Sequence, residues 1–288
     1  QAGSTWNATN TTGPVGTGAV TVNAALATAT LDLNGQVFPN NINLTGSTSY
    51  IANLINSSAT AATQSGAIVL TSNTALATTG GVMTLSGVIS GAKLTVASTN
   101  TGRVVLSGAN TYTGGTTLAS AQNGNYLQVG AGANPYSVMG TGPLYLGGAY
   151  ASLKLGGGSV PVASADFTAS ANITKIAYVA ATTFQFDTNG SGASAAAPVV
   201  LSKGFGNYAS GNFQKVGSGW ISLAKTTTYV GSTNNWGGGV LLNTSNPFNA
   251  GYSFSGTASG QSYGQQSVSG SITQLGVDVT IGALTGAN

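Results

Sequence analysis

The residues that could carry out acid–base or nucleophilic chemistry are few and widely scattered. The chain of 288 residues has no histidine, cysteine or glutamate, and its acidic side chains are Asp32, Asp166, Asp187 and Asp278. Without histidine or cysteine, no Ser–His or Cys–His pair can activate a nucleophile, and zinc lacks its usual ligands. Glycoside hydrolysis generally needs two neighbouring carboxylates, and these four are far apart in sequence. We therefore predict no enzymatic activity, no cofactor and no metal site.

The surface that this composition can build has little charge. Charged residues make up 4% of the chain, whereas an ordinary soluble domain has about 25%. The seven basic residues are scattered and form no patch, so we expect no nucleic-acid partner. No apolar run approaches the roughly 18 residues that would suggest a membrane span. A surface rich in Ser, Thr, Asn and Gly suits an extracellular protein, or one whose stable state is an assembly.

Short segments with alternating apolar and polar residues dominate the chain. Examples are "KLTVAS" (93–98), "VVLSG" (104–108) and "PLYLGG" (143–148). This period of two predicts strands with one buried face, and the Gly, Asn or Ser that follows most of them favours tight turns. The periodicity of an amphipathic helix is absent, so the sequence predicts no helix longer than about 10 residues.

Two of these segments set the expected register of the core. In "TLDLNG" (30–35) and "SLKLGGG" (152–158), a charged residue stands between two leucines. Because one position holds Asp32 and the aligned one Lys154, we expect both to be exposed on an outward face. The leucines expected to be buried beside them are Leu31, Leu33, Leu153 and Leu155.

Degenerate internal repeats organise the chain. The stretch "VVLSGANTYTGGTTL" (104–118) has a diverged copy in "WISLAKTTTYVGSTNNWGGGVLL" (220–242), at a constant offset. A second type of module occurs at 15–35 and 139–157, and a third at 83–92 and 279–287. We expect an N-terminal arm, 1–14, and a single domain, 15–288, with repeats at 15–133 and 134–245 and a partial one at 246–288. The paired residues are Gly102 and Gly219, Leu106 and Leu223, Tyr112 and Tyr229, and Gly114 and Gly231.

Regularly recurring strands without crossover helices point to an all-β solenoid. Its coils would stack at ~4.8 Å, the spacing of paired strands. At roughly 22–25 residues per coil the chain would form about twelve coils. A β-sandwich array is the alternative; it predicts hairpin turns and two packed sheets, and strand spacing alone leaves both folds open.

The motifs also carry a family resemblance. "LSGANTYTGGTTL", preceded by "GRVV" and followed by "YLQVG", "MGTGPLYL" and "LKLGG", resembles the β-strand repeat of bacterial autotransporter passenger domains, over about 83–158. The resemblance implies a right-handed parallel β-helix outside the bacterial cell, with a role in export, surface display or adhesion. Two departures are that the sequence contains no pore-forming translocator barrel and little more than two repeats.

The segment "GANTYTGG" is expected to turn a corner between two core strands that carry Leu106 and Leu118. Asn110 would hydrogen-bond its own backbone, and Tyr112 would cover the corner with its hydroxyl in water. Positive φ angles are expected at the glycines. The predicted turn residues are Asn110, Tyr112, Gly114, Tyr229 and Gly231, with Gly108 and Gly115 as further flexible positions.

Three hypotheses follow from the ends and the aromatic residues. The terminal modules lack an evident cap, so unlike ends could join head to tail into a homopolymer that serves as an extracellular fibre or sheath. A monomeric adhesin that binds surface polysaccharide is the alternative, with Trp6, Trp220, Trp236, Tyr252 and Tyr263 as candidate contacts. A carbohydrate-active enzyme is disfavoured by the scattered carboxylates. The residues expected to make the assembly contact are Trp6, Val277, Val279, Ile281 and Leu284.

Overall fold

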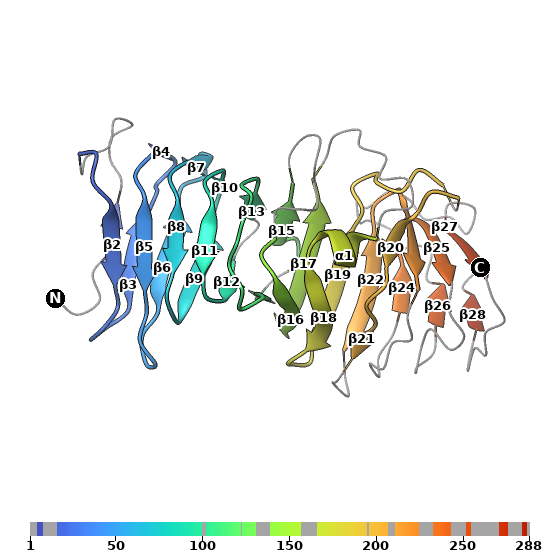
Figure 1. Ribbon diagram of the computed structural model, residues 1–288. Coiled ribbons are helices and arrows are strands. Elements are labelled where there is room, and N and C mark those ends of the chain that lie inside the picture. Colours follow the sequence, from blue (N-terminus) through green and yellow to red (C-terminus); the bar gives the residue numbers. More distant parts are fainter. Residues whose placement is uncertain are drawn as a thin grey trace.

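The chain folds into a β-solenoid, an elongated stack of coils whose strands run across the long axis (Figure 1). β2 and β3 lie at one end of the stack, and β27 and β28 lie at the other. The computed structural model describes residues 5–7, 16–99, 102–121, 123–130, 139–156, 166–194, 196–206, 211–224, 233–242, 252–254, 271–275 and 284–286.

Each coil passes through up to three sides, and on each side a strand pairs in parallel with the strand one coil earlier. The first ladder contains nine strands in the described residues. They are β1 (Thr5–Asn7), β3 (Ala29–Asp32), β6 (Ala52–Asn56), β9 (Thr74–Thr78), β12 (Leu94–Val96), β14 (Thr116–Ser120), β16 (Gly142–Gly148), β18 (Ile173–Tyr178) and β21 (Phe205–Gly206).

The second ladder is the longest, with eleven strands among the described residues. They are β4 (Val37–Phe38), β7 (Ala62–Gln64), β10 (Val82–Leu85), β13 (Arg103–Leu106), β15 (Tyr126–Val129), β17 (Tyr150–Leu155), β19 (Thr183–Asp187), β22 (Asn212–Val216), β24 (Thr233–Asn235), β26 (Tyr252–Phe254) and β28 (Leu284–Gly286).

The third side carries two separate four-stranded ladders. Eight described coils therefore have a strand on this side, whereas eleven have one on the second side. The chain length had predicted roughly twelve coils. The first set is β2 (Val20–Asn23), β5 (Ile42–Thr45), β8 (Ile68–Leu70) and β11 (Ile89–Gly91), and the second is β20 (Val199–Leu201), β23 (Trp220–Leu223), β25 (Gly238–Leu242) and β27 (Ser271–Leu275).

Irregular segments continue the third side between these two sets. Thr111 N donates to Ile89 O over 2.8 Å, and Thr141 N donates to Tyr112 O over 2.8 Å. The next segment is the four-residue helix α1 (Phe167–Ser170), which Asp166 caps by accepting from Ala169 N. Asp166 also forms a parallel β-bridge with Val200 of β20 in the next coil. The stacking of backbone groups therefore persists where strand geometry is lost.

The core runs along the axis as ladders of inward apolar side chains. On the second side, Met83, Val104, Leu127, Leu153 and Phe186 are direct neighbours from coil to coil, and all are buried. Each such side chain contributes about 1.5–3 kcal/mol on burial. Further along the stack an aromatic cluster widens the core, where Phe184, Phe186, Phe205 and Phe213 have ring centroids 4.9–6.2 Å apart.

The parallel ladders show that the β-sandwich alternative is wrong. Among the described strands, every pairing is parallel except one contact between Ser120 of β14 and Tyr150 of β17. A sandwich would need hairpins and antiparallel sheets. The prediction of almost no helix is confirmed, since α1 is a single turn.

The predicted register is correct for the leucines and wrong for the exposure of the charges. Leu31, Leu33, Leu153 and Leu155 are all buried. Asp32 points away from them, yet it is only 3% exposed, because the turn at Ser57 of the next coil covers it. Its carboxylate accepts from Asn34 N at 2.9 Å, from Ser57 N at 3.1 Å and from the Ser57 hydroxyl.

Glycines form a stack at the corner between the second and third sides. A Cβ on Gly87 would lie 2.0 Å from Gly66 O, and a Cβ on Gly108 would lie 2.2 Å from Gly87 O. Gly108 is thus required by the close approach of successive coils. Among Gly108, Gly114 and Gly115, only Gly115 has the expected positive φ, at +80°.

The two copies of the sequence repeat occupy different sides of the coil. Leu106 ends β13 on the second side, whereas its partner Leu223 ends β23 on the third side. Both leucines are buried, at 0% and 1% exposure. The repeat therefore preserves an inward leucine followed by a turn, and its copies do not share one position in the coil.

Candidate functional site

Five strands at the two ends of the described stack pair with a described strand on one side only. Within the described residues, β1 pairs only with β3, β2 only with β5, and β4 only with β7. At the other end, β27 pairs only with β25 and β28 only with β26. None of these five end strands contains a charged residue or a proline, which are two common devices for blocking an exposed edge.

Trp6, a predicted assembly residue, lies on the open end of the core. It is opposite Leu31 in the parallel pair β1–β3, so it shares the inward phase of that leucine. Its indole contacts Phe38 edge to face, with ring centroids 6.3 Å apart, and stays 39% exposed. Leu26, between β2 and β3, is 87% exposed, and Val37 on β4, one coil after Trp6, is 51% exposed. In the described residues, this end thus combines strands paired on one side only with accessible apolar side chains.

The other predicted assembly residues are only partly described. Leu284 begins β28, at the C-terminal end of the second ladder. Val277, Val279 and Ile281 lie outside the described residues, as do Tyr229 and Gly231 of the predicted turn.

The predicted corner at Asn110 and Tyr112 is a buried side of the coil. Asn110 Oδ1 accepts from Ile89 N of the preceding coil at 2.7 Å, so its side chain joins two successive coils. Tyr112 is fully buried, and its hydroxyl bonds Thr116 Oγ1 at 2.7 Å instead of water. Burial raises the pKa of Tyr112 to about 12, although the bonds to Thr116 and to the Gly140 backbone oppose that rise.

The aromatic residues proposed for ligand contact do not form an exposed platform in the described residues. Trp220 and Trp236 are both partly buried. The Trp220 ring lies against the backbone of Gly239 in the next coil, where an added Cβ would come within 2.3 Å of it. Tyr263 lies outside the described residues, and for Tyr252 only the strand placement in β26 is described.

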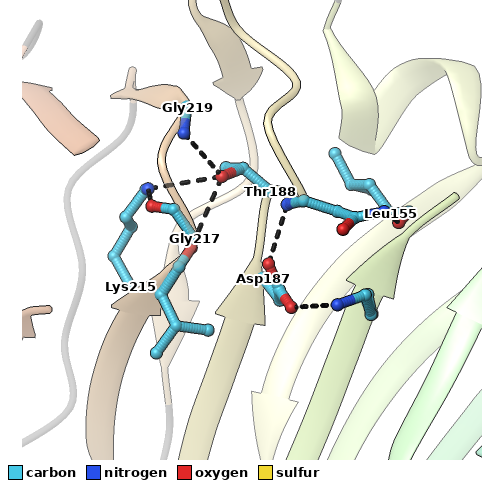
Figure 2. Close-up of polar contacts among 9 residues, drawn as sticks. Leu155, Asp187, Thr188, Lys215, Gly217 and Gly219 are labelled. Atoms are coloured by element: carbon cyan, nitrogen blue, oxygen red, sulfur yellow. Dashed lines mark hydrogen bonds and ion pairs between the residues drawn. The ribbon is translucent and has the colours of Figure 1, made fainter. Parts of the chain in front are cut away.

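A buried polar cluster, which sequence reasoning missed, surrounds Lys215 (Figure 2). Lys215 stands on β22 opposite Phe186 of β19, and its side chain is 0% exposed. Its Nζ donates to Thr188 Oγ1 at 3.3 Å and to the carbonyl oxygens of Gly217 and Gly237. Burial lowers the pKa of Lys215 to about 7, while the nearby Asp187 carboxylate opposes the shift.

Thr188 joins this cluster to the backbone. Figure 2 shows its hydroxyl between Lys215 Nζ and Gly219 N, which donates to it at 3.2 Å. The signal in the sequence was the alternation in "NFQKV" (212–216), which places Phe213 and Lys215 in the same phase. A lysine in an inward phase is rare enough to mark a site worth testing.

An ion pair lies on the outer face of the same sheet. Lys154 Nζ is 2.7 Å from Asp187 Oδ2, and it also lies 5.6 Å from the centre of the Tyr126 ring. Lys154 is therefore half-buried and paired, which corrects the expectation that it is exposed. Asp187 Oδ1 accepts from Asn189 N at 2.7 Å and so fixes the following turn.

Metal-ligand clusters and membrane-spanning helices are absent from the part of the chain that the structure describes. It contains no group of three or more Asp, Glu, His or Cys side chains that could hold a metal ion. Its one helix is far too short to cross a bilayer, and no other helix of the necessary length and apolarity is present there.

The fold defines the chain as a β-solenoid protein whose end strands, among the described residues, pair on one side only. No protein-family model, curated protein or solved structure gives a significant match to the sequence. The function is therefore inferred from the end strands and the side-chain clusters of the solenoid.

Proposed function

We propose that the protein is an extracellular structural subunit that polymerises head to tail through its strand edges, as part of a bacterial surface fibre or sheath. The observation that supports this proposal is that the strands at the two ends of the stack correspond. Among the described strands, the third side runs from β2 to β27 and the second side from β4 to β28. A second copy placed end to end would continue both ladders in parallel.

Physical chemistry favours such an end-to-end contact. Unpaired N–H and C=O groups of a strand edge gain hydrogen bonds when another strand adds to them. The exposed Leu26, Val37 and Trp6 at the N-terminal end of the stack would lose contact with water at the same time. Because the contact joins unlike ends, it does not close on itself and gives a filament unless the rotation allows a ring.

The low charge agrees with this role. Only 4% of residues are charged, so little electrostatic repulsion opposes the approach of identical copies. The family resemblance adds the extracellular, bacterial setting. The adhesin role is an alternative outcome, in which the chain stays monomeric and binds surface polysaccharide.

The experiment compares two lysine substitutions at equally exposed valines. Val37 on the free edge and Val179 after β18 are both 51% exposed. Val37→Lys places a charge at the proposed contact and should reduce filament length and sedimentation coefficient, whereas Val179→Lys should leave assembly close to that of the unmodified chain. Equal effects of the two variants would show that this edge is not the contact.

A further inference from the structure

Lys215 and Asn235 are neighbours inside the solenoid. They are direct partners in the parallel pair of β22 and β24, and they are 0% and 1% exposed. Since Phe213 and Thr233 pair two residues earlier, both side chains belong to the inward phase of their strands. An amine and a carboxamide therefore share one buried rung of the second ladder.

Both side chains also contact the same residue beyond the strand. Lys215 Nζ donates to the carbonyl of Gly237, and Asn235 Oδ1 accepts from Gly237 N at 3.3 Å. Both functional groups are thus hydrogen-bonded to the backbone of Gly237, in the same turn. Lys215 O also accepts from Trp236 N at 2.8 Å, which fixes the relative position of the two strands.

The surroundings of Lys215 do not supply a counter-charge in direct contact. Among the described residues, its Nζ bonds two carbonyls and one hydroxyl, and the carboxylate of Asp187 is engaged by Lys154 on the other face of the sheet. Burying a charged ammonium without a paired carboxylate is costly. A chemical change that removes the charge would remove this cost.

We propose that Lys215 and Asn235 are joined by an intrachain amide bond between Nζ and Cγ. The Lys215 amine attacks the carboxamide carbon, the Nζ–Cγ bond forms, and the bond between Cγ and the amide nitrogen breaks. One amine proton passes to the leaving nitrogen, so that ammonia is released and no oxidant, reductant or further reagent is needed. The Thr188 hydroxyl lies 3.3 Å from Nζ and accepts a hydrogen bond from it.

The site meets the physical needs of this reaction. The nucleophile must be the neutral amine, and burial lowers the pKa of Lys215 to about 7 against the opposing charge of Asp187. Two groups held on adjacent hydrogen-bonded strands react with a high effective concentration. Burial keeps water from competing for the carboxamide. The product would bind two successive coils covalently and resist their separation under tension.

Peptide mapping of the unmodified chain tests the proposal directly. No lysine or arginine follows Lys225, so trypsin normally separates residues 204–215, 216–225 and 226–288. The cross-link would block cleavage after Lys215. We expect one branched peptide of 204–225 joined to 226–288, lighter than the sum of its parts by one ammonia. Separate peptides ending at Lys215, recovered quantitatively from aged protein, would overturn the proposal.

Two variants and one chemical control sharpen the result. Lys215→Met and Asn235→Leu should each abolish the branched peptide. Ammonia can also be lost by ring closure at Asn–Gly sequences such as Asn34–Gly35 and Asn123–Gly124, but that reaction leaves the Lys215 site cleavable. If either variant fails to fold, the digest of the unmodified chain still decides, because it requires no variant. It is also independent of whether the protein forms filaments.

Discussion

Lys154 Nζ and Asp187 Oδ2 lie 2.7 Å apart and connect β17 with β19 in successive coils. The two members of the pair have unequal burial, with side chains 22% and 10% exposed. Asp187 also accepts from Asn189 N, whereas the Lys154 ammonium lies over the Tyr126 ring. Removing the Asp187 side chain should therefore cost more folding stability than removing that of Lys154.

We predict that Asp187→Ala destabilises the protein by about 1–3 kcal/mol, because it removes the ion pair and the bond to the turn. Lys154→Ala should cost about 1 kcal/mol or less. Urea unfolding of both variants measures the two costs, and the double variant gives the coupling energy. A larger cost for Lys154→Ala would contradict the assigned roles.

Asp32 provides a second test of a buried carboxylate. Its oxygens accept from two backbone N–H groups and from the Ser57 hydroxyl. Asp32→Ala leaves those donors without this acceptor, so we expect a loss of about 1–3 kcal/mol in the free energy of unfolding. Ser57→Ala removes only the hydroxyl bond and should cost less. If Asp32→Ala were neutral, the carboxylate would be exposed, as the sequence pattern alone predicted.

The glycine corner predicts a steric effect with a matched control. Gly87→Ala would bring a Cβ to 2.0 Å from Gly66 O, which is backbone and cannot move aside cheaply. We expect a loss of about 3 kcal/mol or more in stability, or failure to fold. A Cβ on Gly18 would meet nothing within 4 Å, so Gly18→Ala should change stability by no more than about 0.5 kcal/mol. Thermal unfolding measures the stability of both variants. Equal stability losses would show that successive coils lie farther apart than these distances indicate.

Tyr112 predicts a dependence of stability on alkaline pH. Burial raises its pKa from 10.0 to about 12 in the folded protein, against the lowering effect of its hydrogen bonds. Because the folded state holds the proton more tightly, this contribution is fully present below about pH 10 and is lost as the pH rises through 12. The unfolding free energy of the unmodified chain should therefore fall more steeply over this range than that of Tyr112→Phe. Parallel curves for the two proteins would show that the hydroxyl is not buried.

The sequence predicted the fold class because alternation reports directly which residues face inward. Leu31, Leu33, Leu153 and Leu155 follow this rule without exception. The predicted exposure of Asp32 and Lys154 was wrong, because it depends on residues one coil away. Ser57 covers Asp32, and Asp187 pairs with Lys154. The predicted contact of the Tyr112 hydroxyl with water was wrong because that hydroxyl bonds Thr116 of the same coil.

The buried cluster could be predicted only in part. Lys215 shares the phase of Phe213, so its inward position was readable from the alternation in "NFQKV". Its pairing with Asn235 could not be predicted, because the number of residues in the coil between them is not given by the alternation. The register is fixed by backbone bonds such as the one from Trp236 N to Lys215 O. The offset of the sequence repeat did not predict this pairing either, since Leu106 and Leu223 lie on different sides of the coil.

Sedimentation velocity of the purified chain over a wide range of concentrations, with negative-stain electron microscopy of the same samples, tests the central claim most directly. Head-to-tail addition predicts rods of many subunits with the width of one, a sedimentation coefficient that rises with concentration, and shorter rods for Val37→Lys than for Val179→Lys. A chain that sediments as a monomer at every concentration, with no rods in the micrographs, would contradict the proposed polymer.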